Sequence, residues 1–315
     1  MRSPEIEIVC PICHEALDDD GCGSCKAKFN KRPGVRSLIC REMYPSDQAF
    51  ASAMQIIEFW GKGWEKRLED AEHKRVFEYD LGALKTWIEK DIEWQKANDS
   101  LLGVDLSMDS LSGKSVLNIG AGAGTEALLL SYSGANCIAM DITSQAAEAA
   151  EFLIRKIGGE GLGVQADARF VPLRDASVDL VYSSGVLHHS PDLARSIAEI
   201  HRVLKPGGRA YIMLYATWSI IFVQMRLKLS LGEKAWETEN RKSPHTTTHT
   251  KRECEEMFSA FENLSIRKTG ASLKQLKLIG RFMPTSFDRF LDPYLGPRLN
   301  IVAQKSAASP ALCRH

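Results

Sequence analysis

The sequence lacks three features that would assign it to a class at once: an excess of one charge, an apolar amino-terminal segment and internal repeats. Its 40 Lys and Arg residues balance 40 Asp and Glu residues, so the composition does not indicate a dedicated nucleic-acid binder. Charged residues follow Met1 without an apolar stretch, and we therefore expect no secretory signal and a cytoplasmic location. A hydrophobic content of 44% in 315 residues is typical of a globular protein.

Apolar runs long enough to cross a membrane without polar interruption are also lacking. The apolar run over residues 210–231 contains Arg226 and Lys228. Because a membrane-spanning helix needs about 20 predominantly apolar residues, we expect no transmembrane segment. The apolar positions from Trp218 to Leu229 instead indicate a cap helix over a site, and an interfacial helix that holds a lipid-linked acceptor is the alternative.

Cysteine is scarce over most of the chain, but four of the eight cysteines fall within the first 25 residues as two CxxC pairs. In a reducing compartment, four thiolates at this spacing suit the tetrahedral shell of a structural Zn²⁺ better than disulfides. The gap of eight residues between the pairs is shorter than in many zinc modules, and four free thiols in a flexible segment are the alternative. We predict a zinc-ribbon-like module over residues 1–42 with Cys10, Cys13, Cys22 and Cys25 as ligands.

From residue 115 onward, short β-branched or apolar runs alternate with helical stretches, which predicts an α/β domain with crossover helices. A Lys-Pro-Gly-Gly sequence over residues 205–208 predicts a turn that ends one of the helices. The expected strands are residues 115–119, 136–140, 163–166, 178–183, 209–214, 264–268 and 299–303. The expected helices are residues 125–131, 143–156, 191–204 and 251–261.

A glycine-rich turn over residues 120–124 follows the first expected strand. Glycine lets a backbone approach a ligand closely at the amino end of a helix. A nicotinamide-binding fingerprint would place Gly or Ala at Thr125, and the Gly-Lys-Ser/Thr ending of a P-loop is missing. Asp141, at the end of the second strand, has acceptor oxygens for a ribose diol. The pattern therefore favours a nucleoside ligand.

Five motifs in order resemble the class I S-adenosylmethionine-dependent methyltransferases over residues 115–215. The motifs are Val116-Leu117-Asn118-Ile119-Gly120-Ala121-Gly122-Ala123-Gly124, Ala139-Met140-Asp141, Gln165-Ala166-Asp167-Ala168, the stretch from Val178 to His189, and Leu204-Lys205-Pro206-Gly207-Gly208. The resemblance implies a Rossmann-like, doubly wound, seven-stranded and mostly parallel sheet, with S-adenosylmethionine as the methyl donor. Residues 8–40 resemble the short zinc ribbons found ahead of some methyltransferases.

The resemblance also implies which residues bind the donor. The Asp167 carboxylate would accept from the adenine amino group and the Ala168 backbone amide would donate to the ring. The family commonly has Asp where this chain has Asn118, which retains an acceptor but loses a negative charge. The donor-binding candidates are Asn118, Gly120, Ala121, Gly122, Gly124, Asp141, Ile142, Asp167, Ala168 and Ser183.

Methyl transfer from a sulfonium chiefly requires alignment of the acceptor with the S–CH₃ bond and exclusion of water. A hydroxyl acceptor also needs a base, and imidazole, with an ordinary pKa of ~6.5, is suited to that role. His188 and His189 follow the fourth strand, at the edge where ligands of open α/β sheets bind. We predict that one of them, His188 first, is the base; His245 and His249 are alternatives, and a role in shaping the loop is the alternative for the pair.

The flanks of the predicted catalytic domain are expected to hold the acceptor site. Aromatic residues at helical spacing among many charges predict a helical lid, and Phe59 and Trp60 are candidates to stack on the donor or the acceptor. The expected organisation is a helical lid or linker over residues 43–112, a methyltransferase domain over 113–305 with cap insertions at about 216–250 and 269–298, and a flexible tail over 306–315.

The preferred hypothesis is a methyltransferase that acts on a small molecule, on a hydroxyl of a sugar or natural-product scaffold, by in-line displacement with a His base. One alternative is a ribosomal-RNA or transfer-RNA base methyltransferase whose zinc ribbon docks RNA; six Lys and Arg against six Asp and Glu in residues 1–40 speak against it. The other is a non-catalytic scaffold that binds S-adenosylmethionine. The sequence leaves O-, N- and C-methylation and the oligomeric state open.

Overall fold

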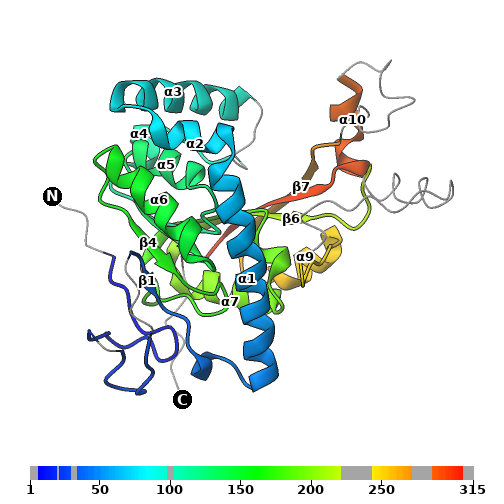
Figure 1. Cartoon of the computed structure of the whole chain (residues 1–315). Helices are drawn as coiled ribbons and strands as arrows, with labels where there is room; N and C mark the ends of the chain where they lie inside the picture. Colours follow the sequence, from blue (N-terminus) through cyan, green and yellow to red (C-terminus); the bar gives the residue numbers. More distant parts are fainter. Residues whose placement is uncertain are drawn as a thin grey trace, which may run out of the picture.

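The computed structural model describes residues 6–19, 21–29, 34–97, 103–220, 243–271 and 286–307. Within these ranges the chain forms one eight-stranded sheet with helices on both faces (Figure 1). The strands are β1 (Arg36–Ser37), β2 (Ser115–Ile119), β3 (Asn136–Asp141), β4 (Leu162–Gln165), β5 (Val178–Ser184), β6 (Leu204–Tyr215), β7 (Glu262–Thr269) and β8 (Arg298–Gln304). Most of the expected cap, about half of the expected inserted loop and most of the expected tail (residues 221–242, 272–285 and 308–315) lie outside the described residues.

The strand order is β1-β4-β3-β2-β5-β6-β8-β7. All pairs from β1 to β6 are parallel, and β8 lies antiparallel to both of its neighbours, β6 and β7. The expectation of a doubly wound, mostly parallel sheet is therefore confirmed. All seven expected strands form close to their expected positions. Strands β3 and β5 lie on either side of β2, and the direction in which the chain adds strands to the sheet reverses between β2 and β5.

The sheet has eight strands where seven were expected, because the amino-terminal segment adds β1. Arg36 and Ser37 pair in parallel with Val164 and Gln165 on β4. This pairing covers an edge that would otherwise expose unpaired backbone groups. Two residues are too few to show a strand periodicity, which explains why the sequence did not predict this element.

The turn expected over residues 205–208 lies inside β6. Val178 pairs with Leu204, but Leu180 pairs with Arg209. Residues 205–208 therefore bulge out of the ladder opposite a single residue of β5. The preceding helix ends at Val203, as the pattern indicated. The Lys-Pro-Gly-Gly sequence therefore ends the helix and makes a bulge within one continuous strand.

Each face of the sheet carries its own apolar core. Helices α5 (Thr125–Tyr132) and α6 (Ser144–Lys156) cover one face, and α7 (Leu193–Val203) covers the other (Figure 1). Along β2, Leu117 and Ile119 belong to the core on the α7 side and Val116 to the core on the α5 side. Because side chains alternate across a strand, a central strand buried on both faces is apolar at nearly every position.

The remaining helices lie around this sheet. They are the 3-10 helices η1 (Arg41–Met43) and η2 (Leu187–His189), and the α-helices α1 (Asp47–Glu69), α2 (Ala71–Glu78), α3 (Leu81–Ala97), α4 (Met108–Leu111), α9 (Lys251–Met257) and α10 (Ser286–Leu295). The long helix α1 begins where the Ser46 side chain accepts a hydrogen bond from the Ala49 amide, and it packs against α6. In the described ranges, no helix combines the length and the apolar character that a membrane span requires.

The third glycine of the turn serves the packing of α5 on α6. Gly124 has a φ of +85°, and a Cβ there would lie 2.7 Å from the Ala150 backbone. Gly158 has a similar φ of +81° with nothing within 4 Å of a Cβ. A side chain at either position would therefore strain the left-handed backbone, but only a side chain at Gly124 would also clash with α6.

We expect Gly158→Ala to lower the free energy of unfolding by about 1–2 kcal/mol, the cost of a left-handed non-glycine residue. Gly124→Ala should lower it by about 1–3 kcal/mol more, because the clash overpacks the α5–α6 contact. Urea unfolding of metal-replete protein measures both. Equal losses for the two variants would show that α5 and α6 do not need this close approach.

Candidate functional site

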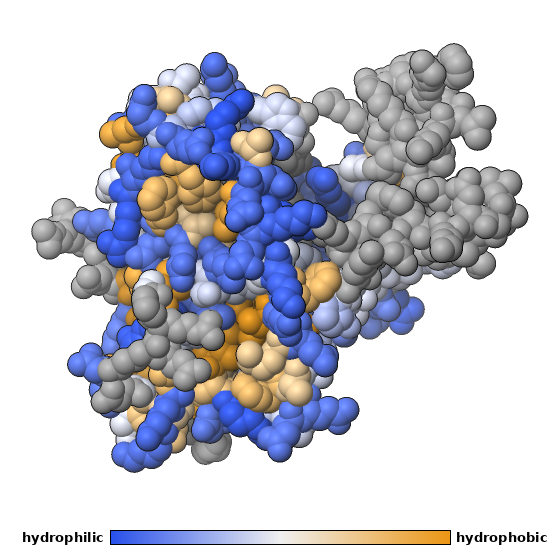
Figure 2. Space-filling view, viewed as in Figure 1, coloured by the Kyte–Doolittle hydropathy of each residue, from blue (hydrophilic) through white to orange (hydrophobic). Residues whose placement is uncertain are grey.

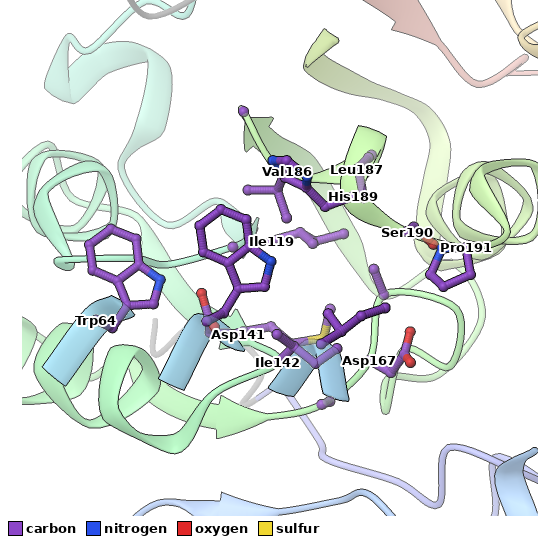
Figure 3. A pocket seen from close by; sticks show the side chains of 17 residues that line it. Trp64, Ile119, Asp141, Ile142, Asp167, Val186, Leu187, His189, Ser190 and Pro191 are labelled. Atoms are coloured by element: carbon purple, nitrogen blue, oxygen red, sulfur yellow. The ribbon is translucent and has the colours of Figure 1, made fainter. Parts of the chain in front are cut away.

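A pocket lies at the carboxyl ends of β2, β3, β4 and β5, next to α1. Its lining comes from the residues that end or directly follow these four strands, together with one face of α1. The chain order reverses between β2 and β5, and ligands of open α/β sheets bind at such a reversal. Figure 3 shows the carboxylates of Asp141 and Asp167 spaced along one side of the pocket, with His189 across from them.

The glycine turn leaves no room for side chains. Gly120 has a φ of +79° and lines the pocket, and a Cβ there would lie 2.1 Å from Val186 Cγ2. Gly122 has a φ of +56°, and a Cβ there would lie 2.9 Å from Trp64 Cη2. Ala121, Gly122 and Gly124 do not line the pocket. Of the turn residues proposed to bind the donor, Gly120 thus borders the pocket itself, and the others shape and pack the turn.

Asp141 is held in one orientation at the end of β3. Its Oδ1 accepts hydrogen bonds from the Thr143 amide and hydroxyl, both at 2.9 Å, and its Oδ2 accepts from the Gly122 amide at 3.2 Å. Burial raises the pKa of Asp141, and these hydrogen bonds act in the opposite direction. The side chain lines the pocket and is 6% exposed. A fixed carboxylate of this kind suits a ribose diol.

Asp167 also lines the pocket, in the loop of residues 166–171 that follows β4, here called the β4 loop. Its carboxylate accepts from the Arg169 amide at 2.9 Å, from Arg169 Nε at 3.0 Å and from Arg169 Nη2 at 2.6 Å. The Tyr44 hydroxyl donates to Oδ2 at 3.1 Å. A carboxylate has about four lone-pair sites, so these donors engage it fully. The adenine contact of Asp167 stays a prediction, and its neighbour Ala168 lines the pocket as well.

Two other donor-binding candidates lie within the strands. Asn118 is 1% exposed on β2, where its Nδ2 donates to the Tyr182 carbonyl at 3.5 Å and its Oδ1 has no partner. Ser183 is fully buried on β5, and its hydroxyl has no partner. Neither lines the pocket, whereas Ile142 does. The roles given to Asn118 and Ser183 stay predictions.

His189 is the histidine that borders the pocket. Its Nδ1 lies 3.1 Å from the His245 carbonyl and 3.0 Å from the Thr246 hydroxyl. Since a carbonyl oxygen only accepts hydrogen bonds, Nδ1 carries the proton, and Nε2 of the neutral ring has a lone pair. That Nε2 is buried without a hydrogen-bond partner. Burial lowers the pKa of His189, so the ring is neutral near pH 7.

The other three histidines proposed as base lie elsewhere. His188 is fully buried, stacks on Tyr215 at 3.7 Å between ring centroids, and has no hydrogen-bond partner on either nitrogen. Burial lowers its pKa well below 6.5. His245 contributes its backbone carbonyl to His189, and His249 Nε2 lies 2.9 Å from the Thr247 hydroxyl. None of these three lines the pocket.

Helix α1 forms one wall of the pocket, and of the residues in this wall the sequence analysis had named Trp60 alone. Ile56, Trp60 and Trp64 line the pocket, and the Trp60 ring centroid lies 4.8 Å from that of His189. Phe59 packs edge-on against Trp60 but does not line the pocket. The spacing of four residues from Ile56 to Trp60 to Trp64 places all three on one helical face, which was the available signal.

The four amino-terminal cysteines come together as expected. The ligand atoms of Cys10, Cys13, Cys22 and Cys25 all lie within 4.8 Å of one another. Sγ of Cys10 lies 3.6 Å from Sγ of Cys25, and Sγ of Cys13 lies 3.4 Å from Sγ of Cys22. Four sulfurs bound to one Zn²⁺ are about 3.8 Å apart. Backbone amides of Cys25 and Ser24 lower the pKa of the Cys22 thiol to about 7, whereas burial raises the pKa of the Cys10 and Cys13 thiols. The donor set therefore fits a tetrahedral metal.

Part of this chain is similar to known methyltransferases. Residues 117–212 match the family described as a methyltransferase domain. Malonyl-acyl-carrier protein O-methyltransferase of Methylococcus capsulatus is 38% identical over 102 residues, which cover 30% of this chain and 34% of that protein. Tocopherol O-methyltransferase of Arabidopsis thaliana is 30% identical over 194 residues, 58% of this chain and 53% of that protein. This chain thus spans about a third to about half of these curated relatives.

Among solved structures, magnesium protoporphyrin IX methyltransferase from Synechocystis, with bound S-adenosylhomocysteine, superposes with a TM-score of 0.48 and 14% identity, over 80% of this chain and 99% of that chain. The sheet order and the pocket at its reversal point are those of a Rossmann-like α/β domain. The family match over residues 117–212 supports a methyltransferase domain of the class I, S-adenosylmethionine-dependent kind in this part of the chain.

We expect full-length protein expressed with ample zinc to contain about one zinc per chain, because the four thiolates fill a tetrahedral shell. Cys22→Ser should lower the zinc content strongly. Cys254→Ala is the matched control, since Cys254 is fully buried in the main core and outside the cluster. Elemental analysis gives the ratio. A metal-free wild-type protein, or a Cys22→Ser variant with full zinc content, would contradict a four-thiolate site.

Proposed function

We propose that the protein transfers a methyl group from S-adenosylmethionine to a small-molecule acceptor by in-line displacement at the methyl carbon. The observation that carries the proposal is the Asp141 carboxylate, fixed at the carboxyl end of β3 inside the pocket. The matching family covers the strands that build this pocket. Asp141 would hold the ribose, the β4 loop the adenine, and the glycine turn the amino-acid end of the donor.

The chemical class of the acceptor is inferred from the side chains that line the pocket near His189. Trp60, Val186 and Leu187 give this part of the pocket apolar surface, and His189 and Ser190 supply polar groups. Such a surface favours an acceptor with an apolar or ring-containing body and one hydroxyl over a sugar. The relatives bear names of quite different acceptors, and the RNA alternative has no support from them. A hydroxyl on a natural-product scaffold is therefore the proposed substrate class.

His189 is the proposed base. The acceptor oxygen forms a bond to the methyl carbon as the carbon–sulfur bond breaks and its electron pair returns to sulfur. The hydroxyl proton goes to Nε2 of His189, whose Nδ1 is held by the His245 carbonyl. The His189 ring is neutral at pH 7, and its Nε2 has no hydrogen-bond partner, so Nε2 can accept a proton as a base must. Trp60, packed on His189, would exclude water from this point.

Donor binding is the first test of the proposal. Calorimetry should register binding of S-adenosylhomocysteine to the full chain, and Asp141→Ala should weaken it on the order of 10- to 100-fold, because hydrogen bonds to a charged group are lost. Asp109→Ala, at an exposed residue of the short helix α4, is the control and should leave the affinity unchanged. Well-folded wild-type protein without measurable binding would refute the proposed function.

The base is tested with an acceptor identified by labelled-methyl transfer to fractionated cell extract. We expect His189→Phe, which keeps the ring contact with Trp60, to lower kcat about 10²- to 10⁴-fold while the affinity for S-adenosylhomocysteine changes little. Because burial lowers the pKa of His189, the acidic limb of kcat/KM should lie below pH 6.5, with a plateau above it.

His188→Phe is the matched control, since it preserves a ring against Tyr215 and removes only ring nitrogens. It should retain kcat. A large loss of kcat in His188→Phe with none in His189→Phe would transfer the base role to His188, and a parallel loss of donor affinity in His189→Phe would indicate a role in shaping the loop.

A further inference from the structure

The amino-terminal segment, defined here as the described residues from Ile6 to Tyr44, contacts the β4 loop on both sides. Before the loop, β1 pairs with the end of β4, and the Leu38 amide donates to the Gln165 carbonyl at 2.8 Å. After the loop, the Val9 amide donates to the Pro172 carbonyl at 3.0 Å. The segment that carries the four cysteines therefore supplies backbone hydrogen bonds on both sides of the loop that contains Asp167.

The same segment also contacts the loop through side chains. Tyr44, 3% exposed, donates its hydroxyl to Asp167, and the Arg169 guanidinium carbon lies 5.3 Å from the Tyr44 ring centroid. Burial raises the pKa of Tyr44, so its hydroxyl keeps the proton that it donates. The Tyr44 ring packs edge-on against Phe170 at 5.7 Å between centroids. Three residues of the loop thus contact one tyrosine of the amino-terminal segment.

Phe170 connects the loop to the second cysteine pair. It belongs to a buried cluster that includes Ala27, Cys40 and Met43. The Ala27 carbonyl accepts the Cys22 amide at 2.9 Å, so the turn around Cys22 sets the position of Ala27. A metal that fixes this turn therefore fixes a surface on which the β4 loop packs.

Helix α1 rests on the same cluster. Ala53 of α1 is a fully buried member, and Phe50 and Ile57 pack against it. Figure 2 shows apolar surface gathered in this region, between the amino-terminal segment and α1. One helical turn or two beyond these residues, α1 presents Trp60 and Trp64 to the pocket. The cluster therefore supports both the β4 loop and the aromatic wall.

We propose that the four-cysteine segment is a working part of the donor site: metal bound at the cysteines and donor bound at the β4 loop stabilise each other, and Tyr44 is the positioning residue that couples them through Asp167. This inference rests on the proposed function. Coupling between two sites is reciprocal, so the metal raises donor affinity by the same factor by which the donor raises metal affinity.

The first experiment compares zinc-loaded and chelator-treated full chain. Binding of S-adenosylhomocysteine, measured by calorimetry, should be weaker without zinc on the order of 5- to 150-fold. In the reciprocal experiment, saturating S-adenosylhomocysteine should slow the release of zinc to a coloured chelator. Equal donor affinity with and without zinc overturns the proposal. Failure of the zinc-loaded wild-type protein to bind the donor at all overturns the proposed function instead.

A second variant keeps the test decisive where the zinc-free chain unfolds. Tyr44→Phe removes one hydroxyl and retains the ring contacts with Phe170 and Arg169. It should keep its zinc, lose donor affinity on the order of tenfold, and lose most of the effect of the donor on zinc release. A loss of the donor's effect on zinc release in a variant that keeps its zinc would show that Tyr44 positions Asp167 and does not merely stabilise the fold.

The matched control is Tyr132→Phe, which removes a hydroxyl that donates to the Glu89 carboxylate at 2.9 Å on the surface between α5 and α3. It should leave donor affinity and zinc release unchanged. If Tyr44→Phe behaves as Tyr132→Phe does, Tyr44 does not couple the two sites and the proposal is wrong.

Discussion

The parallel pairing of β2 with both β3 and β5 is the constraint on which the site depends. The register places Ile119 beside Met140, and the Gly120 amide donates to the Met140 carbonyl at 2.7 Å. This contact brings the glycine turn against the start of the next crossover, where Asp141 accepts from the Gly122 amide. A pocket with a fixed carboxylate follows from strand register and from glycines that admit close backbone approach.

Much of this architecture could be predicted from the sequence because its signals are local. Buried strands are short apolar runs, and several donor-site candidates end or directly follow one, as Asp141 ends β3 and Gly120 follows β2. The choice between His188 and His189 could not be made, since adjacent residues in the short helix η2 point in different directions and the pattern does not say which faces the pocket.

Contacts between segments that are distant in the sequence could not be predicted, because no local pattern indicates them. Tyr44 and Asp167 are 123 residues apart, and nothing near either one predicts their hydrogen bond. The two-residue strand β1 is too short for periodicity, yet it joins the amino-terminal segment to the sheet. An amino-terminal module expected as a separate unit therefore shares its packing with the methyltransferase domain: Leu38 is fully buried in the main core. The separate-domain boundary near residue 42 stays a prediction.

A crystal structure of the zinc-loaded chain with S-adenosylhomocysteine tests the proposed pocket most directly. We predict that the ribose hydroxyls lie within hydrogen-bond distance of the Asp141 carboxylate, the adenine against the β4 loop, and the sulfur on the side of His189 and Trp60. A ligand seated away from the carboxyl ends of β2 and β3, or a ribose that makes no contact with Asp141, would contradict this prediction.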